Sequence, residues 1–400
     1  MSILAGLFAA GLILLVLQDA FEVMLLPRRV QRRVRFMSTY FRVTWGTWSA
    51  FARRLPCGQR REAFLSYFGA LSMLGLFFLW AAALIIGFGI LQWSLQIDLT
   101  GVPRSSLAEQ TYMSGVTFFT LGYGEVVPHS AAGRFIAILE AGTGIGFIAF
   151  VIGYLPVLYQ LFARREAHVI QLDARAGSPP TAVTMLCRHA EAGGLTKLDY
   201  FLREWEVWGS ELLESHLSYP MLAYYRSQHD DQSWLAAVAA VMDCCALILV
   251  GVRELQPLQA RMTFGIARQV VVEMARSFGI EPIRNSGSDR LPHAAYVVLE
   301  GTFARANLEW DTGQETEATL VALRATYEPL LHGLASHLML PLPGWMPNAD
   351  AVEHWEGGHR GLIARQLVEQ LTDPTHSTAV TGSDRQESSW RRLRRRLRRD

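Results

Sequence analysis

The sequence predicts a mainly α-helical membrane protein with three spans per chain and an all-α soluble half. Three long apolar stretches lie in the N-terminal part of the 400-residue chain, and each is long enough to cross a bilayer as a helix. Half of all residues are hydrophobic and 18% are charged, which is typical of a chain that is part membrane and part soluble. Beyond these stretches the apolar residues recur with a helical period.

The first span is expected at Ile3 to Leu26. Its first fifteen residues or so are apolar or glycine, and only Gln18, Asp19 and Glu22 interrupt the rest. A cleaved signal peptide is the alternative, but no positively charged region precedes the apolar run. Asp19 and Glu22 lie near one end of the span, and we expect them to pair with the arginines that follow.

The second span is expected at Phe64 to Trp93, which contains no charged residue. The third is expected at Phe135 to Phe162, where Glu140 is the single charged residue. A carboxyl group at membrane depth faces protein or water rather than lipid. Glu140 therefore either supports a neighbouring element or faces a cavity and attracts cations, and we favour support.

The charges between the spans predict the topology. Pro27 to Glu62 contains ten arginines and one acidic residue, so the positive-inside rule places this loop in the cytoplasm. The N-terminus is then outside, and Arg164 and Arg165 after the third span are cytoplasmic. We expect a multi-pass protein of the plasma (inner) membrane. Within the loop, Tyr40 to Leu55 is expected to form a helix, either in the inner membrane surface or as an ordinary amphipathic surface helix.

The segment from Ser105 to Pro128 is too short and too polar for a further span. We expect it to enter the membrane and return on the same side. Ser106 and Glu109 form a capping-box pattern, which predicts a helix of about three turns that ends near Phe119. The negative end of its dipole then points toward the middle of the membrane, where it favours a cation.

A glycine-rich stretch, Thr120-Leu121-Gly122-Tyr123-Gly124, follows this helix. Glycine alternating with larger residues allows backbone conformations of both hands, so that successive carbonyl oxygens can face one axis. Non-helical backbone at membrane depth is tolerated where it is buried in protein or lines a pore. A cage of carbonyl oxygens can replace the hydration shell of a monovalent cation. The segment therefore predicts a pore made by several chains.

This segment resembles the pore helix and selectivity filter of the potassium channel family, whose filter reads TVGYG. The resemblance covers at most Phe64 to Phe162. It implies a homotetramer, because the chain carries one such loop and the ring needs four. It also implies K⁺ as the permeant ion, with no cofactor and no other metal. The ion-binding residues that it implies are Thr120, Leu121, Gly122, Tyr123 and Gly124.

The resemblance implies supporting roles as well. Thr117 matches a pore-helix threonine, and Glu125 stands where aspartate is usual after the filter. Gly144 falls, by register, where the family has a hinge glycine in its inner helix, although a close approach to the filter would also require glycine. Pro156 is expected to kink this helix. The predicted filter supports are Thr117, Glu125 and Glu140, and the predicted gating residues are Gly144 and Pro156.

The chain from Arg164 onward is expected to form one all-α cytoplasmic domain. The stretch after Trp234 is apolar enough for a fourth span, but Asp243 in its middle favours a buried core helix. The predicted domains are residues 1–63, 64–163, 164–371 and 372–400. The predicted helices are Leu195 to Leu217, Gln232 to Val252, Gln256 to Phe278, Ala294 to Glu309 and Glu315 to Leu340.

The C-terminal tail is polar and then strongly basic. On the cytoplasmic side such a tail is a candidate anchor for anionic lipids of the bilayer; a solvated tail is the alternative, and RNA binding comes third. The net charge of +1 gives no general signal for nucleic acid. The arginines of the tail are Arg391, Arg392, Arg394, Arg395, Arg396, Arg398 and Arg399.

The remaining motifs exclude more than they assign. The sequence has no GxSxG, P-loop, GxGxxG after a strand or HExxH, so an enzyme is not expected. Its four cysteines lack paired spacing, and neither a disulfide nor a metal site is expected. The leading prediction is a potassium-selective homotetrameric channel whose cytoplasmic domain gates it. The alternatives are a weakly selective cation channel and a membrane-anchored signalling or scaffold protein with an inactive pore.

Overall fold

The computed structural model describes residues 2–24, 36–99, 105–191, 194–228, 232–253, 255–283, 289–311 and 313–347. The chain divides into two units, Met1–Asn348 and Ala349–Asp400, and the second lies outside the described residues. The predictions for the first arginines of the basic loop and for the C-terminal arginines therefore lie outside the described part of the chain.

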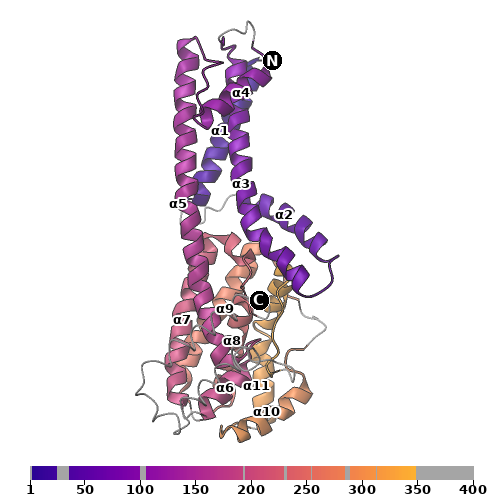
Figure 1. Ribbon diagram of the computed structural model, residues 1–400. Helices are drawn as coiled ribbons and strands as arrows, with labels where there is room; N and C mark the ends of the chain where they lie inside the picture. Colours follow the sequence, from indigo (N-terminus) through magenta and orange to yellow (C-terminus); the bar gives the residue numbers. More distant parts are fainter. Residues whose placement is uncertain are drawn as a thin grey trace, which may run out of the picture. The chain divides into compact units, whose positions relative to one another are not determined.

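The described residues are mainly helical, and their only β-structure is two isolated bridges. The mainly α fold class is thus confirmed (Figure 1). The elements are α1 (Ser2–Met24), α2 (Phe36–Ala52), α3 (Gln59–Ser94), α4 (Leu107–Phe118), α5 (Ala131–Ala176), α6 (Ala182–Glu191), α7 (Leu195–Ser218), the 3₁₀ turn η1 (Pro220–Tyr224), α8 (Trp234–Val250), α9 (Pro257–Phe278), α10 (His293–Arg305), α11 (Gln314–Arg324) and α12 (Glu328–Leu338).

Helices α1, α3 and α5 are long and apolar enough to cross a membrane, as the sequence predicts. Helix α1 packs along α3, where Gly87 leaves room for Ile13: a Cβ atom on Gly87 would lie 2.8 Å from the Ile13 side chain. Asp19 of α1 accepts a hydrogen bond from the indole nitrogen of Trp80 at 3.0 Å. The carboxylate therefore has a partner on α3, whereas the arginines expected to pair with it lie outside the described residues.

Helix α5 is much longer than the predicted third span. It has 46 residues, or about 70 Å at 1.5 Å per residue. It begins beside α3 and α4 and continues past Arg164 to pack against α6, α7 and α8 (Figure 1). It ends at Ala176, because Gly177 takes the left-handed φ of +80°.

Helix α8 forms the centre of the part of the chain that follows α5. Every residue from Trp234 to Ile248 is buried, and α9, α6 and α5 pack around the helix. Asp243 in its middle forms a buried ion pair with Arg290 and accepts a hydrogen bond from the Tyr327 hydroxyl at 2.7 Å. A carboxylate held by protein partners fits the predicted core helix rather than a fourth span.

One helix predicted from the sequence is two helices in the structure. The stretch from Glu315 to Leu340 divides into α11 and α12. Pro329 lies in the first turn of α12. Proline has no N–H to continue a helix that precedes it, but it is tolerated where a helix begins.

Helix α2 packs on protein. Phe41 and Trp45 are buried, with their rings 6.1 Å and 4.9 Å from that of Tyr224, next to η1 and α3. The Trp45 indole also donates to the carbonyl of His337 at 2.9 Å. Because protein covers this aromatic face, the surface-helix alternative describes α2 better than a helix lying in the membrane surface.

Turn η1 is also fastened to α5. Arg165 is buried, and its guanidinium donates to the carbonyls of Leu222 and Tyr225, each at 2.8 Å. Glu166 pairs with it at 2.8 Å. The sequence predicts only a topological role for Arg165, whereas in the structure this residue joins α5 to the turn on which α2 and α3 rest.

The Asp243–Arg290 pair predicts a pH-dependent loss of stability. Burial raises the pKa of Asp243 to about 6, against the opposing pull of the Arg290 guanidinium. An acid with a raised folded-state pKa stabilises the fold most below its unfolded pKa, and this contribution is lost as the pH rises through about 6. Arg290→Met should destabilise by about 3–5 kcal/mol at pH 8, where an unpaired carboxylate is buried, and by clearly less at pH 5.

Thermal unfolding of the purified protein in detergent at both pH values measures this. The control is Arg276→Met, which removes an exposed pair with Glu273 and should change little. Equal losses for Arg290→Met at pH 5 and pH 8 would contradict the prediction.

Candidate pore site

Helix α4 is the predicted pore helix. It begins after Ser106, whose hydroxyl accepts from the backbone N–H of Glu109, while the Glu109 carboxylate accepts from the backbone N–H of Ser106 at 2.6 Å. The predicted capping box is therefore confirmed. The helix ends at Phe118, next to the residue where its end is predicted.

Polar contacts fix α4 against α3 and the turn that follows it. The Gln110 amide donates to the carbonyl of Ile97 at 2.7 Å. Gly89 of α3 faces the backbone of Thr111, where a Cβ atom would lie 2.8 Å from Thr111 Cα. A small residue at this point lets the two backbones approach closely.

Glu140 joins three helices. It is fully buried on α5. One of its oxygens contacts the Ser114 hydroxyl of α4, and the other accepts from the Gln92 amide of α3 at 2.8 Å. The Ser114 hydroxyl also lies 2.7 Å from the carbonyl of Ile85. Glu140 therefore lies between α3, α4 and α5, and its supporting role stays a prediction.

Gly144 is also placed against α4. A Cβ atom there would lie 1.9 Å from the carbonyl oxygen of Phe118, the last residue of α4. Any side chain would displace either helix. Close approach thus explains the glycine, and α5 continues as helix through both Gly144 and Pro156. The gating role of these two residues stays a prediction.

Beyond α4 the backbone alternates in hand. Thr120, Gly122 and Gly124 have φ values of +55°, +61° and +77°, while the residues between them do not have positive φ. Thr120 is a β-branched residue in a conformation that costs such residues free energy, and strain of this kind clusters at functional sites. The first turn of the segment bonds back to the helix, with the N–H of Leu121 donating to the carbonyl of Val116 at 2.9 Å.

The side chains of this segment are open in the single chain. All residues from Leu121 to Glu125 are exposed, and Tyr123 is 63% exposed. The Tyr112 hydroxyl of α4 lies 3.4 Å from the Glu125 carboxylate. Thr117 contributes its backbone carbonyl, which accepts from the N–H of Thr120 at 3.0 Å.

Several partners of these residues are not among the residues predicted from the sequence. Gln92 and Ser114 complete the contacts of Glu140, and Gly89 admits the pore helix. Gln92 carries a usable signal, because an amide near the end of a long apolar stretch needs a polar partner at membrane depth. Ser114 and Gly89 carry none by themselves, since small residues are common in membrane helices.

The contact at Gly144 predicts a sharp difference between two glycines one helical half-turn apart. Gly144→Ala should destabilise the protein by about 3 kcal/mol, the upper range for overpacking, because the neighbour is backbone and cannot turn away. Gly142→Ala should be tolerated, because nothing lies within 4 Å of its added Cβ. Thermal unfolding of both variants in detergent measures this, and similar melting temperatures would refute the contact.

Comparison with known proteins finds relatives that match part of this chain. The chain is 25% identical to the uncharacterized membrane protein YdjJ of Bacillus subtilis, over 38% of this chain and 43% of the relative. It is 34% identical to protein LctB of Bacillus caldotenax, over 16% of this chain and 56% of the relative. The chain thus spans about half the length of each relative. No solved structure matches it.

A family model described as "Ion channel" matches residues 73–160. The matched range begins in α3, includes α4 and the glycine-rich segment, and ends in α5. It contains Glu140 and Gly144. The match and the three membrane-length helices together support a membrane protein with an ion-channel role, and they point away from catalysis.

Proposed function

We propose that the chain forms a potassium-selective channel, in which four copies place residues 120–124 around a common axis. The observation that carries this proposal is the alternation of positive φ at Thr120, Gly122 and Gly124. Alternating hands let consecutive carbonyl oxygens project to the same side of the backbone, as a cage for a dehydrated cation requires. The exposed face of the segment leaves room for the other copies.

The surroundings of the segment support an assembly. Apolar side chains of α5 such as Ile138, Ile145 and Ile152 are 58–70% exposed in one chain. Lipid can cover some of them, but lipid cannot satisfy a non-helical backbone at membrane depth, which needs protein or a water-filled pore around it. The C-terminal end of α4 lies next to Thr120, where its negative dipole favours a cation.

Potassium selectivity is the finer part of the proposal. Tyr123 and both flanking glycines of the resemblance are present. In the proposed filter Thr120, Leu121, Gly122, Tyr123 and Gly124 supply oxygen ligands, with Tyr123 bracing the loop. K⁺ is the permeant ion and needs no cofactor. A weakly selective cation channel and a scaffold with an inactive pore are the competing functions.

The soluble half is the proposed gating domain, on the cytoplasmic side with the Arg-rich loop. Turn η1 gives it contacts with both membrane helices of the pore. Arg165 joins it to α5, and the Tyr225 ring lies against Gly69 of α3, within 2.7 Å of a Cβ position there. A movement of the turn would therefore displace α3 and α5 together.

Reconstitution into liposomes tests the function. We expect K⁺ flux to exceed Na⁺ flux at least tenfold in the wild type. Tyr123→Asp should reduce this ratio, and Gly122→Ala should reduce flux, because alanine at a φ of +61° costs about 1 kcal/mol or more in each copy. Gly146→Ala, which meets nothing within 4 Å, is the control.

Equal fluxes of the two ions would replace the proposal with the weakly selective channel. A folded tetramer without flux under any condition tried would favour the scaffold. A monomer in the bilayer would refute the pore.

The position of Glu140 predicts a graded effect on selectivity. Glu140→Ala should leave Ser114 and the Gln92 amide without their shared partner, at a cost of about 1–3 kcal/mol, and lower the K⁺ to Na⁺ permeability ratio. Glu140→Gln keeps the shape and a polar group at both contacts, so it should retain most of the ratio. Reversal potentials in planar bilayers measure it, with Thr143→Ala as control, because the Thr143 hydroxyl bonds within α5 to the carbonyl of Leu139. Equal ratios for Glu140→Ala and wild type would exclude a supporting role.

A further inference from the structure

Two neighbouring cavities meet at Met24, the last residue of α1. One, of about 470 Å³, lies between α1 and α5 within the membrane-length helices. The other, of about 650 Å³, lies where α1 ends, beside α5 and α7. Met24 lines both of them. Because Met24 is common to both linings, the two cavities adjoin at the end of α1, one among apolar residues and the other among polar residues.

The cavity between α1 and α5 is apolar. Its walls include Phe21 of α1 and Ile138, Phe147 and Phe150 of α5, and Thr143 is its one hydroxyl-bearing residue. The Thr143 hydroxyl already donates to the carbonyl of Leu139 at 2.8 Å. A groove of this kind takes a hydrocarbon chain and offers nothing to a polar ligand.

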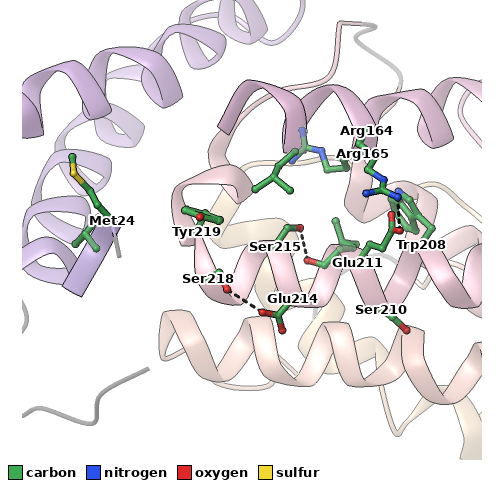
Figure 2. A pocket seen from close by; sticks show the side chains of 13 residues that line it. Met24, Arg164, Arg165, Trp208, Ser210, Glu211, Glu214, Ser215, Ser218 and Tyr219 are labelled. Atoms are coloured by element: carbon green, nitrogen blue, oxygen red, sulfur yellow. Dashed lines mark hydrogen bonds and ion pairs between the residues drawn. The ribbon is translucent and has the colours of Figure 1, made fainter. Parts of the chain in front are cut away.

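The second cavity carries charges of both signs, as Figure 2 shows. Arg164 of α5 pairs with Glu211 of α7 at 2.9 Å and is 67% exposed. One turn along α7, the Glu214 carboxylate accepts from the Ser218 hydroxyl at 3.2 Å. A basic group from α5 and acidic groups from α7 thus line this cavity, at the level where the apolar part of α5 ends.

Trp208 adds an unsatisfied donor to this cavity. The side chain lines it and is only 3% exposed, and its indole nitrogen has no hydrogen-bond partner. A buried N–H without an acceptor costs about 1–3 kcal/mol. A rotation of the side chain toward the cavity would let an acceptor oxygen of a bound molecule remove that cost.

From these features we propose that the two cavities bind one glycerophospholipid with a zwitterionic ethanolamine headgroup. Its phosphate accepts from the Trp208 indole and faces Arg164, and its ammonium donates to Glu214. An acyl chain lies in the groove past Met24. The site rests on the proposed function only in requiring that α1 and α5 cross the membrane, and the lipid belongs to the leaflet beside α7.

The charge pattern favours this lipid over other occupants. An anionic headgroup without an ammonium would leave Glu211 and Glu214 facing its phosphate, and a choline headgroup has no N–H to donate. A second copy of the chain could cover the groove between α1 and α5. It would not explain an unsatisfied indole among charges of both signs beyond the end of the groove.

Native mass spectrometry of the purified full-length protein tests the proposal with phosphatidylethanolamine, phosphatidylcholine and phosphatidylglycerol as probes. We expect the wild type to bind phosphatidylethanolamine about tenfold more tightly than the other two lipids. Trp208→Phe, which removes the N–H and keeps an aromatic ring, should weaken this binding about tenfold, as loss of one charge-assisted hydrogen bond predicts. Glu214→Gln should abolish the preference for ethanolamine over choline.

Matched controls on the same helix separate binding from folding. Trp205→Phe makes the same truncation one turn away, and Glu204→Gln neutralises an exposed carboxylate outside the cavity; both should keep the wild-type preference. Binding of all three lipids alike, or Trp208→Phe and Glu214→Gln behaving like their controls, would overturn the proposal. An oligomer that binds none of the three lipids would also overturn it, because the groove between α1 and α5 would then be closed to lipid. None of these results depends on ion flux, so a failure here leaves the channel proposal to its own test.

Discussion

The need to satisfy backbone polar groups at membrane depth is the constraint on which the rest of this structure depends. Residues 120–125 leave the helical conformation between two membrane-length helices. Their first N–H groups bond back to the end of α4, and the side chains that follow lie open on one face of the chain. Extended backbone in this position requires water, ions or further protein on its open side. The proposed tetramer would meet that requirement, whereas a single chain in lipid would not.

A small set of contacts positions α4 and the segment that follows it. Each contact depends either on a particular side chain or on a glycine, which has none. The backbone of α4 approaches α3 at Gly89 and α5 at Gly144. Between these two points Glu140 gathers a hydroxyl from α4 and an amide from α3. These hydrogen bonds lie in apolar surroundings, where a buried polar group without a hydrogen-bond partner destabilises the protein. Close packing at the two glycines and the hydrogen bonds of Glu140 therefore fix the position of α4, and with it the start of the segment.

Much of the structure from α4 through residue 125 could be predicted from the sequence because its signals are local. The capping box at Ser106 and the glycine alternation after Thr120 involve residues within a few positions of one another. The contacts that join distant segments could not be predicted in this way. Arg164 and Arg165 are adjacent and identical in type, yet one is exposed to solvent and the other is buried against η1. Their environments differ because neighbouring residues on a helix point about 100° apart, and only the tertiary packing shows which direction faces protein. The full length of α5 could not be predicted for the same reason. Beyond Phe162 the helix continues with buried apolar residues on one side only, at Val169, Leu172 and Ala176.

The unbroken course of α5 has a thermodynamic consequence. A single helix lines the proposed pore and is then built into the core of the soluble half, where Arg165 and Val169 are buried. The two regions share one stiff element, so an equilibrium in either includes the free energy of moving it. Linkage then works in both directions. If a molecule bound to the part of the chain after α5 changes the ratio of open to closed channels by some factor, its affinities for the open and the closed state differ by the same factor. Holding the proposed pore open or closed would therefore change the affinity for a molecule bound at the far end of α5.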